Sequence, residues 1–247
     1  MHSHIMQNLK DQIEINQPIN ISGLKLYPLN LPKNKNIDNL VSFDHLLKKK
    51  KARALEVSEE GNVNSIKIVN DSPHNLFIFD GEVILGAKQN RISERSVILK
   101  PYSETILSVF CIERGRWQYR GVREFAESKF AASPKMRAAK NLDSFEMHRA
   151  QSEVWKSVNE YSEKKLEYSM TEDFDELLNK TSKDLNIEEN EVINNINCNG
   201  FIVVGAGRPF IEIFFNKDIL KQYLEKSIRT WTADHENEGL YMSPSSA

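Results

Sequence analysis

Residues Gly81 to Arg120 read GEVILGAKQNRISERSVILKPYSETILSVFCIERGRWQYR, and this stretch carries the strongest signals for both fold and function. Short runs alternate apolar and polar residues and are separated by turn residues, which is typical of antiparallel β-strands. Two polar clusters follow apolar runs, namely Gly86–Arg91 (GAKQNR) and Cys111–Trp117 (CIERGRW). We therefore predict two strand-end clusters joined by a β-hairpin around Pro101.

Size and composition indicate a soluble globular protein. The chain has 247 residues, 40% of them hydrophobic and 28% charged, with a formal net charge of −2. This length can bury a core without disulfides or metals, and the near-neutral charge argues against nucleic acid as an obligatory partner. No apolar run approaches the ~20 residues of a membrane-spanning helix, and the opening residues lack the apolar segment of a signal peptide. We expect a cytoplasmic protein with no membrane partner.

The cysteines and motifs exclude several common chemistries. Cys111 and Cys198 are the only two cysteines and lie far apart, with no CxxC or Cys/His spacing, which favours a reducing compartment and no metal site. The apolar neighbours of Cys111 indicate an inert buried thiol rather than a nucleophile. Neither a GxSxG motif nor a phosphate-binding loop is present, and the glycines after Val204 do not form a dinucleotide fingerprint. The sequence predicts no particular cofactor.

Periodicity along the chain predicts an α+β fold. Runs of period two from Ala54 onward indicate an antiparallel, β-sandwich-like sheet, preceded by a short edge strand at Leu24–Tyr27. A central helical segment follows, with a long helix that ends near Tyr168 and a second helix capped by Thr171. Two apolar runs around a Gly-Ala-Gly turn then predict a β-hairpin, and a final helix begins near Lys217.

We expect one α+β domain over residues 20–234. Residues 20–120 form its β-rich half, and residues 121–234 form the helical segment with the closing hairpin and helix. Residues 1–19 and 235–247 are expected to be loose termini.

The segment from Arg114 to Lys140 is basic, with eight Lys or Arg residues against two Glu residues. Such a concentration creates a local positive field that suits an anionic, phosphorylated small-molecule ligand. Alternatively, the segment is a basic face that pairs with the acidic helix following it. Binding of RNA or DNA through this segment is a minor third alternative.

Glu113 is the candidate catalytic residue. Its neighbours Arg114 and Arg116 favour the ionised carboxylate, which can act as a general base if the strand ends at a cleft. If Glu113 instead pairs with an arginine in the sheet, its role is structural.

The candidate ligand-binding residues come from both clusters and the residues after them. A guanidinium presents a planar fork of donors to phosphate or carboxylate, and the amide side chains of Gln89 and Asn90 both donate and accept. Trp117 can stack on a ring, although tryptophan at a sheet edge is also common in cores. The candidates are Lys88, Gln89, Asn90, Arg91, Arg116, Trp117 and Arg120.

These clusters resemble a family of domains named for their association with ADP-ribosylglycohydrolases and rhodanese-like phosphatases. The resemblance rests on Gly81-Glu82, on Gly86–Arg91 and above all on Cys111–Trp117, and it extends more faintly to the QSEVW run at Gln151 and to the closing helix. It implies a link to nucleotide-derived molecules such as ADP-ribose. Where the family pattern often has glutamine after Glu113, this chain has arginine.

The sequence is therefore compatible with two alternative functions. In the first, the chain binds or processes a nucleotide-derived anion such as an ADP-ribose-like molecule at the two clusters. In the second, it is a non-catalytic binding or interaction module in which the same residues lock the sheet to the helices. The sequence does not decide between an enzyme and a binding protein, and it does not predict an oligomeric state.

Overall fold

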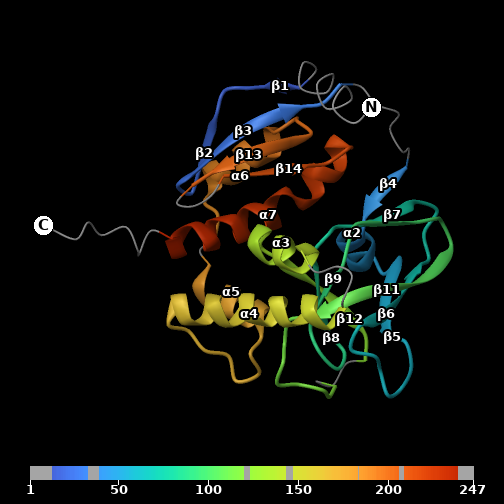
Figure 1. Ribbon diagram of the computed structural model, residues 1–247. Helices are drawn as coiled ribbons and strands as arrows, with labels where there is room; N and C mark the ends of the chain where they lie inside the picture. Colours follow the sequence, from blue (N-terminus) through green and yellow to red (C-terminus); the bar gives the residue numbers. More distant parts are fainter. Residues whose placement is uncertain are drawn as a thin grey trace, which may run out of the picture. The chain divides into compact units, whose positions relative to one another are not determined.

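The computed structural model describes residues 13–32, 39–119, 123–142, 147–182, 184–205 and 209–238. Contacts divide the chain into two compact units, drawn in Figure 1. The central unit is Asn39–Lys183, and the terminal unit combines Met1–Asp38 with Asp184–Ala247. The expected single domain over residues 20–234 stays a prediction.

A six-stranded antiparallel sheet forms the frame of the central unit. Its strand order is β12 (Phe125–Ala131), β8 (Glu82–Gly86), β9 (Arg91–Ser93), β11 (Ser103–Cys111), β6 (Ser65–Asn70) and β5 (Ala52–Glu56). The two ends of this order meet, because Leu55 forms an antiparallel bridge with Glu124 just before β12. The sheet therefore curls back on itself as a small half-barrel.

A second sheet and a short helix complete the core of this unit. The sheet has the order β10 (Val97–Leu99), β7 (Asn75–Ile78) and β4 (Leu40–Ser42), with β4 parallel to β7. Helix α2 (Phe43–Lys48) begins directly after β4, where the Ser42 side chain accepts a hydrogen bond from the His45 N–H and so caps the first turn. One apolar cluster unites these elements, and its members include Phe43, Leu46, Ile66, Ile68, Ile84, Val109 and Phe125.

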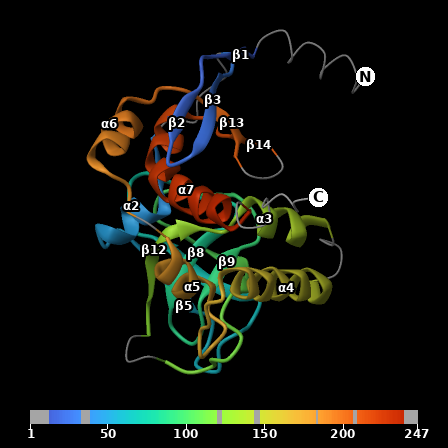
Figure 2. The same cartoon turned by 90° about the vertical axis from the view of Figure 1, so that its left-hand side faces the viewer.

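Three helices follow the strands of the central unit. Helices α3 (Pro134–Leu142) and α4 (Met147–Lys165) pack against each other, as Figure 2 shows, and α4 also contacts α5 (Phe174–Thr181). The buried residues of α4 recur every three to four positions, which is the period of one helix face. One of them, Tyr161, meets Phe174 edge to face with ring centroids 5.4 Å apart. This contact joins α4 to the first turn of α5.

The terminal unit is a smaller antiparallel sheet with two helices. Its sheet has the order β1 (Glu14–Ile15), β3 (Leu24–Asn30), β13 (Gly200–Val204) and β14 (Phe210–Ile213), and β2 (Ile19–Ile21) also pairs with β3. Helices α6 (Ile187–Asn195) and α7 (Lys217–Glu238) belong to this unit. Trp231 of α7 packs edge to face on Phe201 and Phe210.

The predicted α+β class is confirmed, and so are the antiparallel strands, the β13–β14 pair and the closing helix. The sandwich-like packing is not confirmed, since the largest sheet curls on itself. Among the described residues, no helix is both long enough and apolar enough to cross a membrane.

Three details of the prediction are wrong. No hairpin forms around Pro101, because β10 pairs with β7 while β11 pairs with β6 and β9. Strand β3 is interior rather than an edge, because it pairs on both sides. The cap of α5 is Asp173 and not Thr171, since the Asp173 side chain accepts from the Asp175 N–H.

Several elements were not predicted, among them β9, β12 and α3. Strand β9 spans three residues, too few for a visible alternation, and β12 lies inside the basic segment, where charge hides its pattern. Helix α3 also begins inside that segment.

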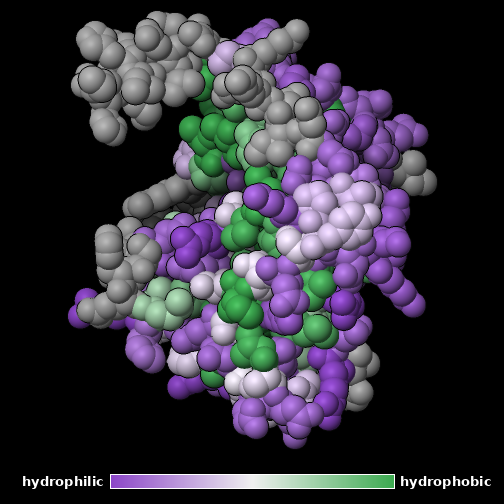
Figure 3. Space-filling model, turned by 90° about the vertical axis from the view of Figure 1, so that its right-hand side faces the viewer, coloured by the Kyte–Doolittle hydropathy of each residue, from purple (hydrophilic) through white to green (hydrophobic). Residues whose placement is uncertain are grey.

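Figure 3 shows apolar side chains lying among hydrophilic ones on one face, and in the central unit the exposed apolar residues include Ile98 and Ile106.

Candidate functional site

The first predicted cluster is the turn of the β8–β9 hairpin. Gly86 has φ +111° and Ala87 has φ +42°, so the chain reverses through the left-handed region that glycine tolerates best. The turn closes with a hydrogen bond from the Gln89 N–H to the Gly86 carbonyl at 3.1 Å. The Asn90 side-chain oxygen accepts from the Gly86 N–H at 2.8 Å and fixes the same turn. Side chains of the cluster are thereby held at the end of the hairpin.

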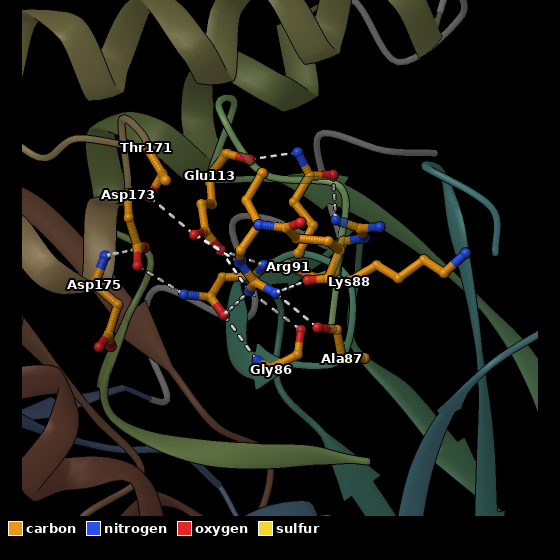
Figure 4. Close-up of polar contacts among 12 residues, drawn as sticks. Gly86, Ala87, Lys88, Arg91, Glu113, Thr171, Asp173 and Asp175 are labelled. Atoms are coloured by element: carbon orange, nitrogen blue, oxygen red, sulfur yellow. Dashed lines mark hydrogen bonds and ion pairs between the residues drawn. The ribbon is translucent and has the colours of Figure 1, made fainter. Parts of the chain in front are cut away.

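The second cluster provides a buried ion pair. Arg116 donates from Nε to Oε1 of Glu113 at 2.8 Å and from Nη2 to Oε2 at 2.6 Å (Figure 4). Glu113 is 0% exposed and Arg116 is 5% exposed. The other terminal nitrogen of Arg116 donates to the carbonyls of Ala87 at 2.6 Å and Gln118 at 2.8 Å. One arginine therefore connects the hairpin turn, the end of β11 and the loop after it.

Further donors surround the Glu113 carboxylate. The Asn90 N–H donates to Oε2 at 3.1 Å, and the Thr171 hydroxyl donates to Oε1 at 2.9 Å. Burial raises the pKa of Glu113, but the hydrogen bonds from Arg116, Asn90 and Thr171 outweigh burial and hold the pKa below its ordinary value. The carboxylate is thus ionised at neutral pH and surrounded by protein donors.

Asp173 extends the network to the start of α5. Its Oδ2 accepts from the Asn90 side chain at 2.9 Å, and its Oδ1 accepts from the Asp175 N–H at 3.1 Å (Figure 4). Burial, together with the charges of Glu113 and Asp175, raises the pKa of Asp173 to about 6 despite the bond from Asn90. One amide side chain, that of Asn90, therefore bridges the hairpin and a helix cap that lies 83 positions later.

Close backbone approach explains Gly115. The Gly115 N–H donates to the Thr171 carbonyl at 2.9 Å, and a Cβ at position 115 would lie 2.9 Å from the Thr171 Cα. A side chain there would displace Thr171 from Glu113.

In the same region Gln151 of α4 exchanges two hydrogen bonds with the Cys111 backbone, at 2.8 and 2.9 Å, and so ties α4 to β11.

Arg91 differs from Arg116 in its hydrogen bonds. Its side chain is 0% exposed, and Nη1 donates to the Gln89 side-chain oxygen at 2.5 Å. Its Nε and Nη2 atoms, which form the side edge of the guanidinium, have no acceptor within the part of the chain that the structure describes. Burial lowers the pKa of Arg91, and the nearby Cys111 and Glu56 oppose this effect. Two buried donor atoms of one arginine therefore have no partner among the described residues.

The Trp117 ring lies against this arginine, and Lys88 lies over the rings of Trp117 and Tyr119. The Arg91 guanidinium lies 5.3 Å from the Trp117 ring centroid, and Trp117 is 42% exposed. The Lys88 ammonium lies 5.6 Å from the same centroid and 5.4 Å from that of Tyr119. In Figure 4 the Lys88 side chain extends away from the Glu113 network. We call the group Glu56, Lys88, Arg91, Trp117 and Tyr119 the Trp117 site.

Residues 12–244 match the family model of the ARG and Rhodanese-Phosphatase-superfamily-associated Protein domain, ARPP-1. The chain belongs to this family. Searches of curated proteins and of solved structures found no match to this ARPP-1 domain.

Most described charges of the basic segment of this ARPP-1 domain have acidic or aromatic neighbours. Lys135 pairs with Glu160 of α4 at 2.8 Å, and Arg123 pairs with Glu59 at 3.0 Å. Lys140 is buried and donates to Asp80 at 2.5 Å. Only the first of these pairs fits the alternative in which the segment neutralises the helix that follows it.

The structure brings most predicted site residues of the ARPP-1 domain together in one place. Gln89, Asn90, Glu113 and Arg116 form a single buried network, and Arg91, Lys88 and Trp117 lie beside it. Arg120 lies outside the described residues. Both polar atoms of the Gln89 side chain form hydrogen bonds within the protein. Its nitrogen donates to the Glu113 carbonyl, and its oxygen accepts from Arg91.

Sequence reasoning missed Tyr119 and three residues that are distant in the sequence. Thr171 and Asp173 reach Glu113 and Asn90 from a segment more than 50 positions away, and Thr171 carried only the signal of a helix cap. Glu56 reaches the site from the end of β5, where it accepts from the Lys88 N–H at 3.2 Å. Within the described ranges, no group of three or more His, Cys, Asp or Glu side chains is arranged to hold a metal ion.

Proposed function

We propose that this protein binds a nucleotide-derived anionic small molecule, such as an ADP-ribose-like compound, at the Trp117 site. The site would hold its ligand without a chemical step carried by Glu113. Membership of a family named for ARG and rhodanese-phosphatase association supports the ligand class. The two separate, buried cysteines favour the cytoplasm as the setting.

The observation that carries this proposal is the unused edge of Arg91. A buried guanidinium with unpaired donors is costly, so a site that contains one gains affinity for an acceptor group. The same edge of Arg116 is occupied by the Glu113 carboxylate, which illustrates the bidentate partner that this geometry accepts. An exposed Trp117 supplies a ring for stacking, and Lys88 supplies a cation for the anionic part.

Glu113 is better suited to positioning than to proton transfer. A general base must come within hydrogen-bond reach of the proton that it removes. The Glu113 oxygens already accept hydrogen bonds from Arg116, Asn90 and Thr171, so protein donors occupy the positions that a substrate proton would take. These contacts orient the hairpin and the loop that carry Arg91 and Trp117.

Calorimetric titration with ADP-ribose and ADP tests the proposal. We expect binding to the wild type and a loss of about tenfold in Trp117→Ala, since stacking of one base is worth roughly 1–3 kcal/mol. Arg91→Lys keeps the charge but removes the fork and should weaken binding in the same direction. Arg95→Ala removes an exposed arginine outside the site and is the matched control.

Two outcomes would overturn the proposal. If the wild type binds neither compound, the second function gains support, in which the buried motif is structural and the chain is a non-catalytic interaction module. If the protein turns over ADP-ribose and a folded Glu113→Gln variant does not, Glu113 is a catalytic residue after all. Product analysis by NMR distinguishes binding from turnover.

A further inference from the structure

Glu56 gives the Trp117 site a second unused polar atom, of the opposite kind. Its Oε1 accepts from the Lys88 N–H at 3.2 Å, whereas its buried Oε2 has no donor in the described part of the chain. Arg91 and Glu56 do not bond to each other. As far as the structure describes the chain, the site therefore combines two unpaired donor atoms on Arg91 with one unpaired acceptor atom on Glu56.

Glu56 Oε2, Lys88 and Trp117 pack closely around Gly61, and the Arg91 guanidinium lies 5.3 Å from the Trp117 ring centroid. A Cβ built on Gly61 would lie 3.1 Å from Glu56 Oε2, 3.2 Å from Lys88 Cδ and 3.3 Å from Trp117 Cζ2. Gly61 also has φ +73°, a conformation in which glycine is favoured. The loop after β5 thus brings its backbone against the tryptophan and the carboxylate, with no side chain of its own between them.

The positive Arg91 and the negative Glu56 together discriminate between the phosphate and the base of a nucleotide. A phosphate satisfies an arginine fork, but its own charge is repelled by a buried carboxylate close by. A nucleobase edge is neutral and presents acceptors and an N–H donor side by side. Adenine, for example, offers the N7 acceptor next to the N6 amino donor. Only the second kind of group satisfies both Arg91 and Glu56.

We propose that the Trp117 site recognises the nucleobase of its ligand, with ring acceptors bound by Arg91, an amino donor bound by Glu56, and the phosphates left outside near Lys88. This inference rests on the proposed function and specifies which end of the ligand is buried. It makes Glu56 a specificity-determining residue.

Titration with adenosine, which has no phosphate, and with ribose 5-phosphate, which has no base, tests the inference. We expect wild type to bind adenosine and Glu56→Gln to weaken that binding by about tenfold or more, as expected for a hydrogen bond to a charged acceptor. Binding of ribose 5-phosphate should not change. Glutamine retains an oxygen for the Lys88 N–H, and thermal unfolding checks that the variant is folded.

Glu59→Gln is the matched control. This substitution removes the same charge from an exposed glutamate, which pairs with Arg123. It should leave adenosine binding unchanged. If Glu56→Gln tightens ribose 5-phosphate, or leaves adenosine binding unchanged, the inference is wrong although the proposed function stands. If wild type binds ADP-ribose but not adenosine, the inference is also wrong. If wild type binds none of the three compounds, the proposed function itself fails.

Discussion

Arg116 and Glu113 form a two-point ion pair in which both partners are almost fully buried, with N–O distances of 2.8 and 2.6 Å. Such pairs contribute little net stability when compared with apolar residues, but breaking one leaves an uncompensated buried charge. The central unit is therefore sensitive to substitution at this pair.

Glu113→Gln should lower the free energy of unfolding by about 3–5 kcal/mol, because the buried Arg116 would lose its counter-charge. Urea unfolding followed by circular dichroism measures this change. Glu104→Gln, which removes an exposed carboxylate paired with Lys67 at 2.9 Å, is the control and should cost at most about 1 kcal/mol. Equal small effects of both variants would contradict a structural role for the pair.

Asp173 should make stability depend on pH. Its folded-state pKa is about 6 against an ordinary 3.8, so between these values the folded state holds a proton that the unfolded state has lost. This contribution is present in acid and is lost as the pH rises through 6, by roughly 3 kcal/mol in total. Glu113 has the opposite sign, because its lowered pKa costs stability as the pH falls.

Comparison with Asp173→Asn isolates the Asp173 effect, since asparagine also caps helices but does not titrate. The variant should gain stability relative to wild type between pH 4 and pH 7.5. An unchanged difference between the two proteins across this range would show that Asp173 titrates normally.

Gly115→Ala should destabilise the protein by about 1–3 kcal/mol, because the new methyl group would lie 2.9 Å from the Thr171 Cα. The sign of the stability change shows whether there is space for the methyl group. Where space is available, replacing glycine by alanine stabilises a protein by about 0.4–1 kcal/mol through the unfolded state. A rise in melting temperature would therefore show that Thr171 does not approach Gly115 so closely.

Local patterns in the sequence predicted the local structure well. The alternation in β6 and β11 and the helical spacing in α4 and α7 were visible because each depends on neighbours in the chain. The pairing of β10 with β7 was not, since both strands are short and apolar and fit several partners.

The sequence predicted which residues belong to the candidate site better than it predicted how they bond to one another. Charge and residue type identified Glu113, Arg116 and Arg91, but nothing local shows that Arg116 is paired while the side edge of Arg91 is not. Thr171, Asp173 and Glu56, which also take part, reach the clusters only through the tertiary fold.

The division of the chain into units has a consequence for synthesis on the ribosome. The central unit is one continuous segment, whereas β3 of the terminal unit pairs with β13, where Leu29 faces Gly200. At roughly 5–20 residues per second, β3 emerges about ten to thirty seconds before its partner strand exists. The nascent chain can complete the central unit during that interval, while β1, β2 and β3 are made but β13 and β14 are not.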